Sequence, residues 1–354
     1  MRTLTSRTTP IVLRSFRGSE DLLTQLAGRV VGQSTALAEI VPYIQMHRAG
    51  LAPEGRPAGV FLLLGPTGTG KTRTVEALAE VLHGSEKHLL RVDCGEFQME
   101  HEVAKLIGAP PGYLGHRETQ PMFTQQKLSA VTSESSNLAL VLFDEIEKAA
   151  PSMTRLLLGV LDKAVLRLGD NTMVNFERTL IFLTSNLGTQ AMRKELAPDF
   201  GFESIVVAEG VAAGHTNLKT PYKKLDAIGL TAVKRKFSPE FVNRIDAVIT
   251  YHPLGQDALD DILDLQLQAL QRHVENRLEE RAFEIVVTDE ARAFLLQNGT
   301  SSEYGARELK RTVLRLLTQP LAALVESGRA PPESVVVAGY KHGAERLDLK
   351  VRRD

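Results

Sequence analysis

Residues 65–72 read Gly65-Pro66-Thr67-Gly68-Thr69-Gly70-Lys71-Thr72, which matches the pattern G-x-x-x-x-G-K-[ST] of a phosphate-binding P-loop. An apolar run of strand length, 60–64, precedes this loop, and residues 72–81 have the pattern of a helix. The glycines let the backbone turn its N–H groups toward phosphate oxygens, and the helix adds its positive dipole end. Lys71 is expected to reach the β- and γ-phosphates, and the Thr72 hydroxyl to hold Mg²⁺. The sequence therefore predicts a site for a nucleoside triphosphate here.

Four more apolar runs of strand length follow the P-loop. They lie at residues 89–93, 138–143, 179–184 and 247–251. Strands that are almost wholly apolar and alternate with helices indicate a parallel sheet with both faces covered. Polar residues follow several of these strands directly, at the edge where ligands bind in such sheets. We therefore expect an α/β P-loop large domain.

The alternation of apolar strands with helices stops at His252-Pro253-Leu254-Gly255, where we place a domain boundary. Beyond it the sequence predicts a long amphipathic helix (258–278), a strand (283–287), a helix capped by Asp289 (290–297), a long helix (306–326) and two closing strands. This is a small α+β domain. We expect an N-terminal tail at 1–20, a large domain at 21–251 and a small lid domain at 252–354.

Acidic and amide side chains follow two of the predicted strands. Asp144 and Glu145 end the strand 138–143, and Asn186 follows the strand 179–184. Downstream of a P-loop, Asp144 is expected to bind Mg²⁺ and Glu145 to activate the attacking water. Asn186 is expected to bond the same water and the γ-phosphate. The alternatives are a capped strand end for the two acids and a turn-forming Asn before Gly188.

Two arginines are candidates for neutralising phosphate charge. Arg244, in the run 237–246, can stabilise the transition state in cis or in trans, and the alternative is a surface pair with Asp246. Arg307 opens the long helix of the small domain and can couple nucleotide state to the angle between the domains. Its alternative is an ordinary exposed position on the helix.

Composition excludes several classes of protein. The chain has 354 residues and a formal net charge of −1, so no bulk basic field argues for nucleic acid. A single cysteine, Cys94, excludes an intramolecular disulfide framework and suits a reducing compartment. No apolar run approaches 18 residues, and the first residues lack the apolar core of a secretory signal. We expect a cytoplasmic protein without a membrane span.

Taken together, the motifs resemble one AAA+ ATPase module of the Clp unfoldase and chaperone family. Within that family they resemble the second, C-terminal module of the ClpA/ClpB/ClpC branch. The resemblance covers about residues 25–340, and the motifs that carry it are 30–33, 56–57, 65–72, 106–115, 143–148, 184–188, 239–246 and 304–307.

The resemblance implies a homohexameric ring that hydrolyses ATP between subunits and threads polypeptide through its pore. Arg244 would then serve the neighbouring site as an arginine finger, with Asn186 as sensor 1 and Arg307 as sensor 2. Val30 and Val31 would line the adenine pocket, with Ile262 packing from the small domain. Tyr113, on the loop 108–115 that composition alone would assign to any exposed turn, would grip an unfolded or tagged polypeptide in the pore.

The chain also departs from the family pattern. We expect a chain that starts at its own Met1, without an N-terminal substrate domain or a first ATPase ring, and without a coiled-coil middle domain. Residues 162–166 lack the Gly-Arg that usually follows the Asp, so we expect an altered second pore loop. Phe200-Gly201-Phe202 is the candidate for docking a peptidase, and Ile228-Gly229-Leu230 is the other candidate, but lies in a helical pattern. The alternative function is an isolated ATPase module that assists assembly or regulation without unfolding proteins itself.

Overall fold

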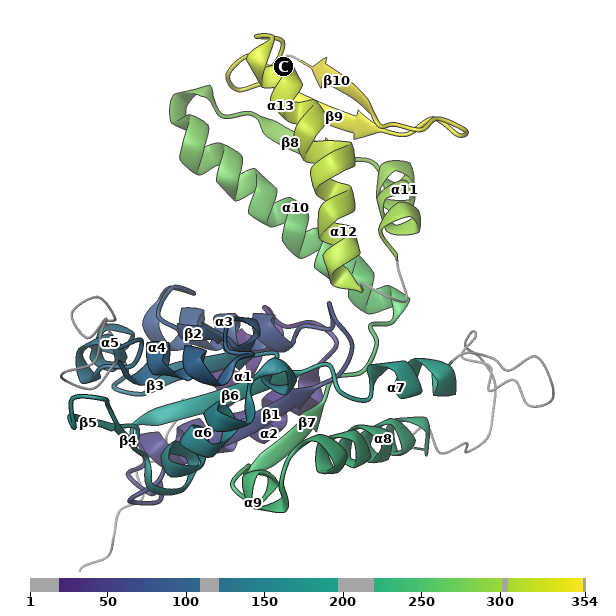
Figure 1. The fold of residues 1–354 in the computed structure, drawn as a ribbon. Helices are drawn as coiled ribbons and strands as arrows, with labels where there is room; N and C mark the ends of the chain where they lie inside the picture. Colours follow the sequence, from purple (N-terminus) through teal and green to yellow (C-terminus); the bar gives the residue numbers. More distant parts are fainter. Residues whose placement is uncertain (1–18, 109–120, 197–219, 301–304, 353–354) are drawn as a thin grey trace, which may run out of the picture.

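The computed structural model describes residues 19–108, 121–196, 220–300 and 305–352 (Figure 1). Its first part is built on a five-stranded, fully parallel sheet in the order β2-β3-β6-β1-β7. The strands of this sheet are β1 (Gly59–Leu64), β2 (Leu90–Asp93), β3 (Ala139–Asp144), β6 (Thr179–Ser185) and β7 (Ala247–Thr250). The five predicted strands are all present, and the predicted fold class is confirmed.

Helices cover both faces of this sheet because its strands alternate their side chains between two separate cores. In β1, Val60, Leu62 and Leu64 enter one core, while Phe61 and Leu63 enter the other. The helices of this part of the chain are α1 (Ser19–Ala27), α2 (Ser34–Arg48), α3 (Lys71–His83), α4 (Ala104–Ile107), α5 (Gln125–Ala130), α6 (Pro151–Lys163), α7 (Thr189–Leu196), α8 (Thr220–Lys236) and α9 (Pro239–Val242). Helices α1 to α3 pack into the second core, and α4, α5, α6, α8 and α9 pack into the first. This two-sided burial explains why the strands are almost wholly apolar.

Short elements complete this part. The sequence did not predict an antiparallel hairpin of β4 (Val165–Arg167) and β5 (Met173–Asn175), which directly follows α6. The 3-10 turns are η1 (Cys94–Glu96), η2 (Glu100–Val103) and η3 (Ile146–Lys148). Helix α8 contains Ile228-Gly229-Leu230, as the helical pattern predicted.

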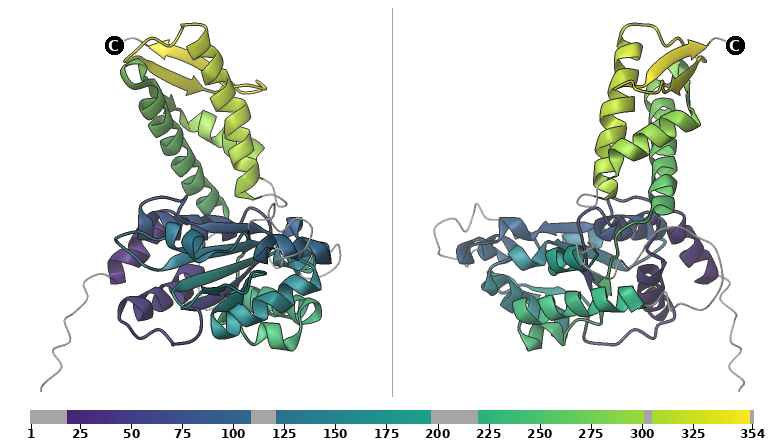
Figure 2. Two further views of the ribbon diagram at one scale, coloured as in Figure 1. Left: turned by 60° about the vertical axis from the view of Figure 1, so that its left-hand side comes forward. Right: turned by 90° about the vertical axis from the view of Figure 1, so that its right-hand side faces the viewer.

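The second part is a small α+β unit with a core of its own, which contains Leu259, Phe294 and Leu321. Both views of Figure 2 show it standing on the large unit. Its sheet has the order β10-β9-β8. Its elements are α10 (Gln256–Leu278), η4 (Glu279–Arg281), β8 (Glu284–Val287), α11 (Asp289–Gly299), α12 (Ala306–Val313), η5 (Leu314–Thr318), α13 (Gln319–Glu326), β9 (Val335–Gly339) and β10 (Asp348–Arg352).

One local prediction for this unit was wrong, and a second had the right bounds but missed an irregular turn. Thr288, and not Asp289, caps α11, because its hydroxyl accepts the N–H of Ala291. The predicted long helix is interrupted by the π turn η5. Pro320 explains the interruption, since it has no N–H to give to the carbonyl of Leu316 and its ring would clash with that carbonyl in a regular helix.

None of the helices in the described part of the chain has both the length and the apolar character needed to cross a membrane.

Candidate nucleotide site

The predicted P-loop connects the carboxyl end of β1 to the first residue of α3. Gly65 has a φ of 137°, and a Cβ there would lie 2.3 Å from the carbonyl oxygen of Tyr251. Gly70 has a φ of 102° and immediately precedes α3. Both positions therefore require glycine, for a close approach at the first and for a left-handed conformation at the second.

Lys71 is buried at the first position of α3, and its ammonium group lies inside the loop. Its Nζ donates to the carbonyl oxygens of Gly65 at 2.6 Å and Pro66 at 2.9 Å, and to Oδ1 of Asn186 at 3.1 Å. Burial lowers the pKa of Lys71 to about 8, against the opposing effect of three nearby carboxylates led by Glu147. The structure thus brings Lys71 and Asn186 together, although they are 115 residues apart in the chain.

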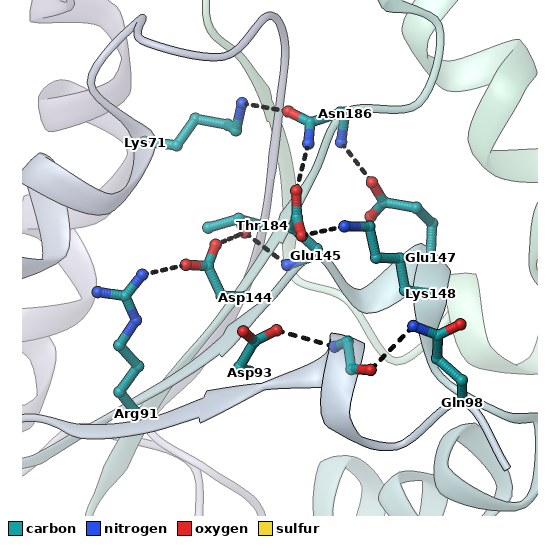
Figure 3. A network of polar contacts seen from close by, with 11 residues as sticks. Lys71, Arg91, Asp93, Gln98, Asp144, Glu145, Glu147, Lys148, Thr184 and Asn186 are labelled. Atoms are coloured by element: carbon teal, nitrogen blue, oxygen red, sulfur yellow. Dashed lines mark hydrogen bonds and ion pairs between the residues drawn. The ribbon is translucent and has the colours of Figure 1, made fainter. Parts of the chain in front are cut away.

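Asp144 is the last residue of β3, and both of its carboxylate oxygens have partners. Oδ2 forms an ion pair with Arg91 of β2, and Oδ1 accepts a hydrogen bond from the Thr184 hydroxyl of β6 (Figure 3). Thr184 in turn accepts the backbone N–H of Glu145 at 3.0 Å. The neighbouring strands therefore fix the position of the acid pair.

Glu145 has a left-handed backbone with a φ of 56°, which turns its side chain out of the strand. Its Oε2 lies 2.5 Å from Nζ of Lys148, and its Oε1 accepts from Nδ2 of Asn186 at 3.1 Å (Figure 3). The amide of Asn186 thus joins Glu145 to Lys71. This contact fits the expectation that Glu145 and Asn186 act on the same water molecule.

Glu147 belongs to this network, although sequence reasoning gave it no role. Its Oε1 accepts the backbone N–H of Asn186 at 3.0 Å. Its Oε2 is buried and has no partner in the described part of the chain. The sequence signal was its place in the run 143–148, but only the fold shows that it supports the loop carrying Asn186.

The small unit contacts the P-loop at the start of α12. The N–H of Ala306 donates to the carbonyl oxygen of Gly68 at 3.1 Å. Arg307 therefore lies in the first turn of a helix that begins at the loop, and its positive charge lowers the pKa of Lys71. The structure brings Arg307 to the site from a part of the chain more than 200 residues away.

The residues predicted for the adenine pocket lie on both units. Val30 is buried in the core of α1 to α3, Val31 is half-buried, and Ile262 packs against the core of the small unit. Gln33, to which we gave no separate role, is also buried. Its Nε2 donates to the carbonyl oxygens of Thr69 at 3.1 Å and His252 at 3.0 Å, so one side chain joins the P-loop to the connection between the units.

Arg244 does not join the site. It lies between α9 and β7, and the backbone N–H of Asp246 donates to the carbonyl of Val60 at 2.9 Å, at the amino end of β1. The P-loop follows the carboxyl end of that strand, about 16 Å away at roughly 3.3 Å per residue. Figure 1 shows α9 at the end of β7 remote from the small unit.

The alternative partner considered for Arg244 was wrong. Asp246 binds Nη2 of Arg56 at 2.6 Å and the N–H of Val60 at 2.8 Å. Arg244 instead pairs with Asp162 at the end of α6, with Nη1 and Oδ1 3.2 Å apart.

Several predicted features lie outside the described residues. These are Tyr113, Phe200-Gly201-Phe202 and residues 1–18 of the tail.

The arrangement fits a bound nucleoside triphosphate and Mg²⁺. Within the described residues, the backbone N–H groups of 67–70 have no protein acceptor, as expected for groups that bind phosphate. Lys71 and Arg307 supply positive charge beside them. Thr72 and Asp144 are the hydroxyl and carboxylate that would hold the metal.

A P-loop after the first strand, an acid pair after the third and a separate unit resting on the loop define a P-loop nucleoside triphosphatase. A family model described as "AAA domain (Cdc48 subfamily)" matches residues 56–248. A second, described as the "C-terminal, D2-small domain, of ClpB protein", matches residues 254–338. The chain belongs to this AAA family of ATPases, and the pair of matches fits the C-terminal ATPase module of the Clp proteins, as the motifs predicted.

Similar proteins with curated names support the same family. The chaperone protein ClpB of Vibrio cholerae is 36% identical over 324 residues, which cover 92% of this chain and 34% of the relative. ClpB of Aquifex aeolicus is 39% identical over 319 residues, covering 90% and 29%. A solved complex of S. cerevisiae Hsp104 with casein superposes with a TM-score of 0.77 and 26% identity, over 95% of this chain and 53% of that one. The chain thus spans about a third of the length of these ClpB relatives.

Proposed function

We propose that this chain is an ATP-driven motor module that works in a homohexameric ring and threads polypeptide through the pore of that ring. One observation carries the proposal: the residues suited to hydrolysis lie at one edge of the sheet, and Arg244 lies at the other. The length of β1, about 16 Å at roughly 3.3 Å per residue, separates Arg244 from its own P-loop, so this arginine is too far away to bind a phosphate there. A neighbouring subunit in a closed ring can receive it instead.

Within one subunit, each residue at the P-loop edge has a separate task. Lys71 and the N–H groups of the P-loop bind the phosphates, and Thr72 and Asp144 hold Mg²⁺. The metal would supply charge neutralisation for the phosphate oxygens. Glu145 takes the proton of the attacking water, which Asn186 orients through the amide that already contacts Glu145.

The remaining contacts of the nucleotide come from both units. Val30, Val31 and Ile262 enclose the base, and Arg307 contacts the phosphates from the small unit. Since α12 begins at the P-loop, a change in the nucleotide can move the small unit. We place the boundary between the units at His252, because Tyr251 belongs to the core of the large unit and Leu254 packs against the core of the small one.

The polypeptide substrate is proposed from chemistry and from the relatives. A single aromatic side chain such as Tyr113 can hold an extended chain without reading its sequence, and the Hsp104 neighbour was solved with casein, a polypeptide. Docking of a peptidase through Phe200-Gly201-Phe202 stays a prediction.

The test compares ATP hydrolysis with and without unfolded casein. The wild-type rate should rise when casein is added, and Glu145→Gln should lower the rate about 10²-fold or more while ATP still binds, since a general base contributes roughly that much. Glu326→Gln, on the far helix α13, is the matched control and should behave as wild type. Tyr113→Ala should keep hydrolysis but lose unfolding of a tagged substrate.

Sedimentation distinguishes the motor from the isolated-module alternative. With ATP, the Glu145→Gln protein should sediment as a hexamer. A protein that stays monomeric, and whose rate of ATP hydrolysis does not change when casein is added, would contradict the motor proposal. It would favour a module that assists assembly or regulation.

A further inference from the structure

Separate contacts fix the backbone and the guanidinium group of Arg244. Its backbone is fixed because Asp246, two residues on, is bound to Arg56 and to the start of β1. Its guanidinium is held separately, by the ion pair between Nη1 and Asp162 at 3.2 Å. Its Nε is buried without a partner in the described part of the chain. The direction of the guanidinium therefore depends on Asp162.

Asp162 is in an unfavourable place for a carboxylate. It lies in the last turn of α6, where the helix dipole disfavours negative charge. Asp162 and Arg244 are both half-exposed, so neither charge needs the other as compensation for being buried. The next residue, Lys163, has the charge that suits a helix end. A carboxylate at position 162 is thus better explained by Arg244 than by the stability of α6.

The pair leaves part of the guanidinium available. Arginine presents five N–H donors in a planar fork, and one carboxylate oxygen at Nη1 occupies only one side of it. A partly exposed guanidinium held at one nitrogen can still donate from the other to a phosphate oxygen of a second molecule. A long flexible side chain held in this way also loses less conformational entropy when it binds.

We propose that Asp162 is a positioning residue that aims the Arg244 guanidinium at the nucleotide bound by the neighbouring subunit. The inference rests on the proposed action of Arg244 in trans. It assigns no contact between Asp162 and the nucleotide.

The first test is kinetic. Asp162→Ala and the isosteric Asp162→Asn should lower kcat for ATP by roughly tenfold to a hundredfold, the range for a misdirected catalytic group, with little change in KM. Asp162→Glu should restore part of the rate, because it keeps the charge. Lys163→Ala changes the same end of α6 but leaves the ion pair between Asp162 and Arg244 in place, so it should keep the wild-type rate. A normal or raised rate in both Asp162→Ala and Asp162→Asn overturns the inference.

The second test separates positioning from a purely structural role. Glu145→Gln subunits are expected to hydrolyse ATP very slowly but carry an intact Arg244. In mixed rings they should raise the rate of each Asp162→Ala subunit several-fold, because they supply a correctly held arginine. A defect inside the Asp162→Ala subunit itself would not be rescued, and that result also overturns the inference.

The double variant Asp162→Ala/Arg244→Ala distinguishes the failure of this inference from that of the proposed function. It should be no slower than Arg244→Ala alone, since Asp162 acts only through Arg244. If Arg244→Ala itself hydrolyses ATP at the full rate, the proposed role of Arg244 fails. If Arg244→Ala is slow and the Asp162 variants are not, only the positioning inference fails.

Discussion

His83, near the end of α3, is a buried side chain whose protonation is tied to the fold. Its Nδ1 lies 2.9 Å from the Ser133 hydroxyl and its Nε2 lies 3.0 Å from the carbonyl oxygen of Leu138. Burial lowers the pKa of His83 below its ordinary value of 6.5, and the nearby His88 lowers it further. The unfolded chain therefore binds a proton at a higher pH than the folded chain does.

We expect the free energy of unfolding to fall as the pH drops below about 6.5, because the unfolded state then binds more protons at position 83 than the native state. His83→Gln should reduce this dependence, as measured by urea denaturation between about pH 5 and pH 8. His252, whose pKa is also lowered by burial, should leave some dependence in the variant. His342→Gln, at an exposed histidine, is the control, and equal slopes in both variants would contradict the prediction.

The sequence predicted which residues would meet at the P-loop edge but not how they would be held. Asp144, Glu145 and Asn186 follow buried strands, so their place could be inferred from the rule for parallel sheets. The hydrogen-bond and ion-pair partners of these side chains could not be inferred in this way. Arg91 and Thr184 approach Asp144 from neighbouring strands, 53 and 40 residues away in the chain. Such pairs depend on strand order, which no local pattern specifies.

At the scale of elements, the contact between α12 and the P-loop depends on Gly305. This glycine has a φ of 49°, and a Cβ there would lie 2.8 Å from the carbonyl oxygen of Gly68. The same carbonyl accepts the N–H of Ala306. A methyl group at position 305 would therefore push α12 and Arg307 away from the loop.

Gly305→Ala should weaken ATP binding about tenfold, through the lost hydrogen bond and the displaced Arg307. Gly328→Ala is the matched control, because Gly328 also has a positive φ, of 68°, but a Cβ there meets nothing within 4 Å. Gly328→Ala should lose about 1–2 kcal/mol of stability from its positive φ, and Gly305→Ala should lose more, because its φ of 49° and ψ of −136° are a combination that residues with a Cβ rarely adopt. Titration with a fluorescent nucleotide measures the difference, and equal affinities would show that the contact does not contribute to binding.

Long apolar elements were predicted well, and short or interrupted ones were not. The central strands β1, β3 and β6 are almost wholly apolar, so their positions could be predicted without tertiary information. The strands β4 and β5 have three residues each, too few for a period to be read. The π turn η5 could not be predicted, because a proline such as Pro320 disturbs a regular helix in either of two ways. The helix can end there, or it can continue through a π turn, and the sequence does not show which.

At the scale of the whole molecule, the sheet separates the two groups of residues that the proposed reaction requires. Its carboxyl edge carries Lys71, Asp144, Glu145 and Asn186, and its amino edge carries Arg244. The sequence alone left open whether Arg244 acts in cis or in trans, since a position in the chain does not give an edge of a sheet. Strand direction supports action in trans, because the length of β1 lies between the two.

This separation predicts that two inactive variants will restore activity when they are mixed. Arg244→Ala subunits keep Glu145, and Glu145→Gln subunits keep Arg244, so a functional site forms wherever the first accepts an arginine from the second. In randomly mixed rings at equal amounts, about a quarter of the sites combine both intact residues, and we expect about a quarter of the wild-type rate. The control mixes Arg244→Ala with Glu145→Gln/Arg244→Ala, which has no arginine to donate and should stay inactive. If Arg244 served its own subunit, neither mixture would recover, because every subunit would still lack one of the two groups.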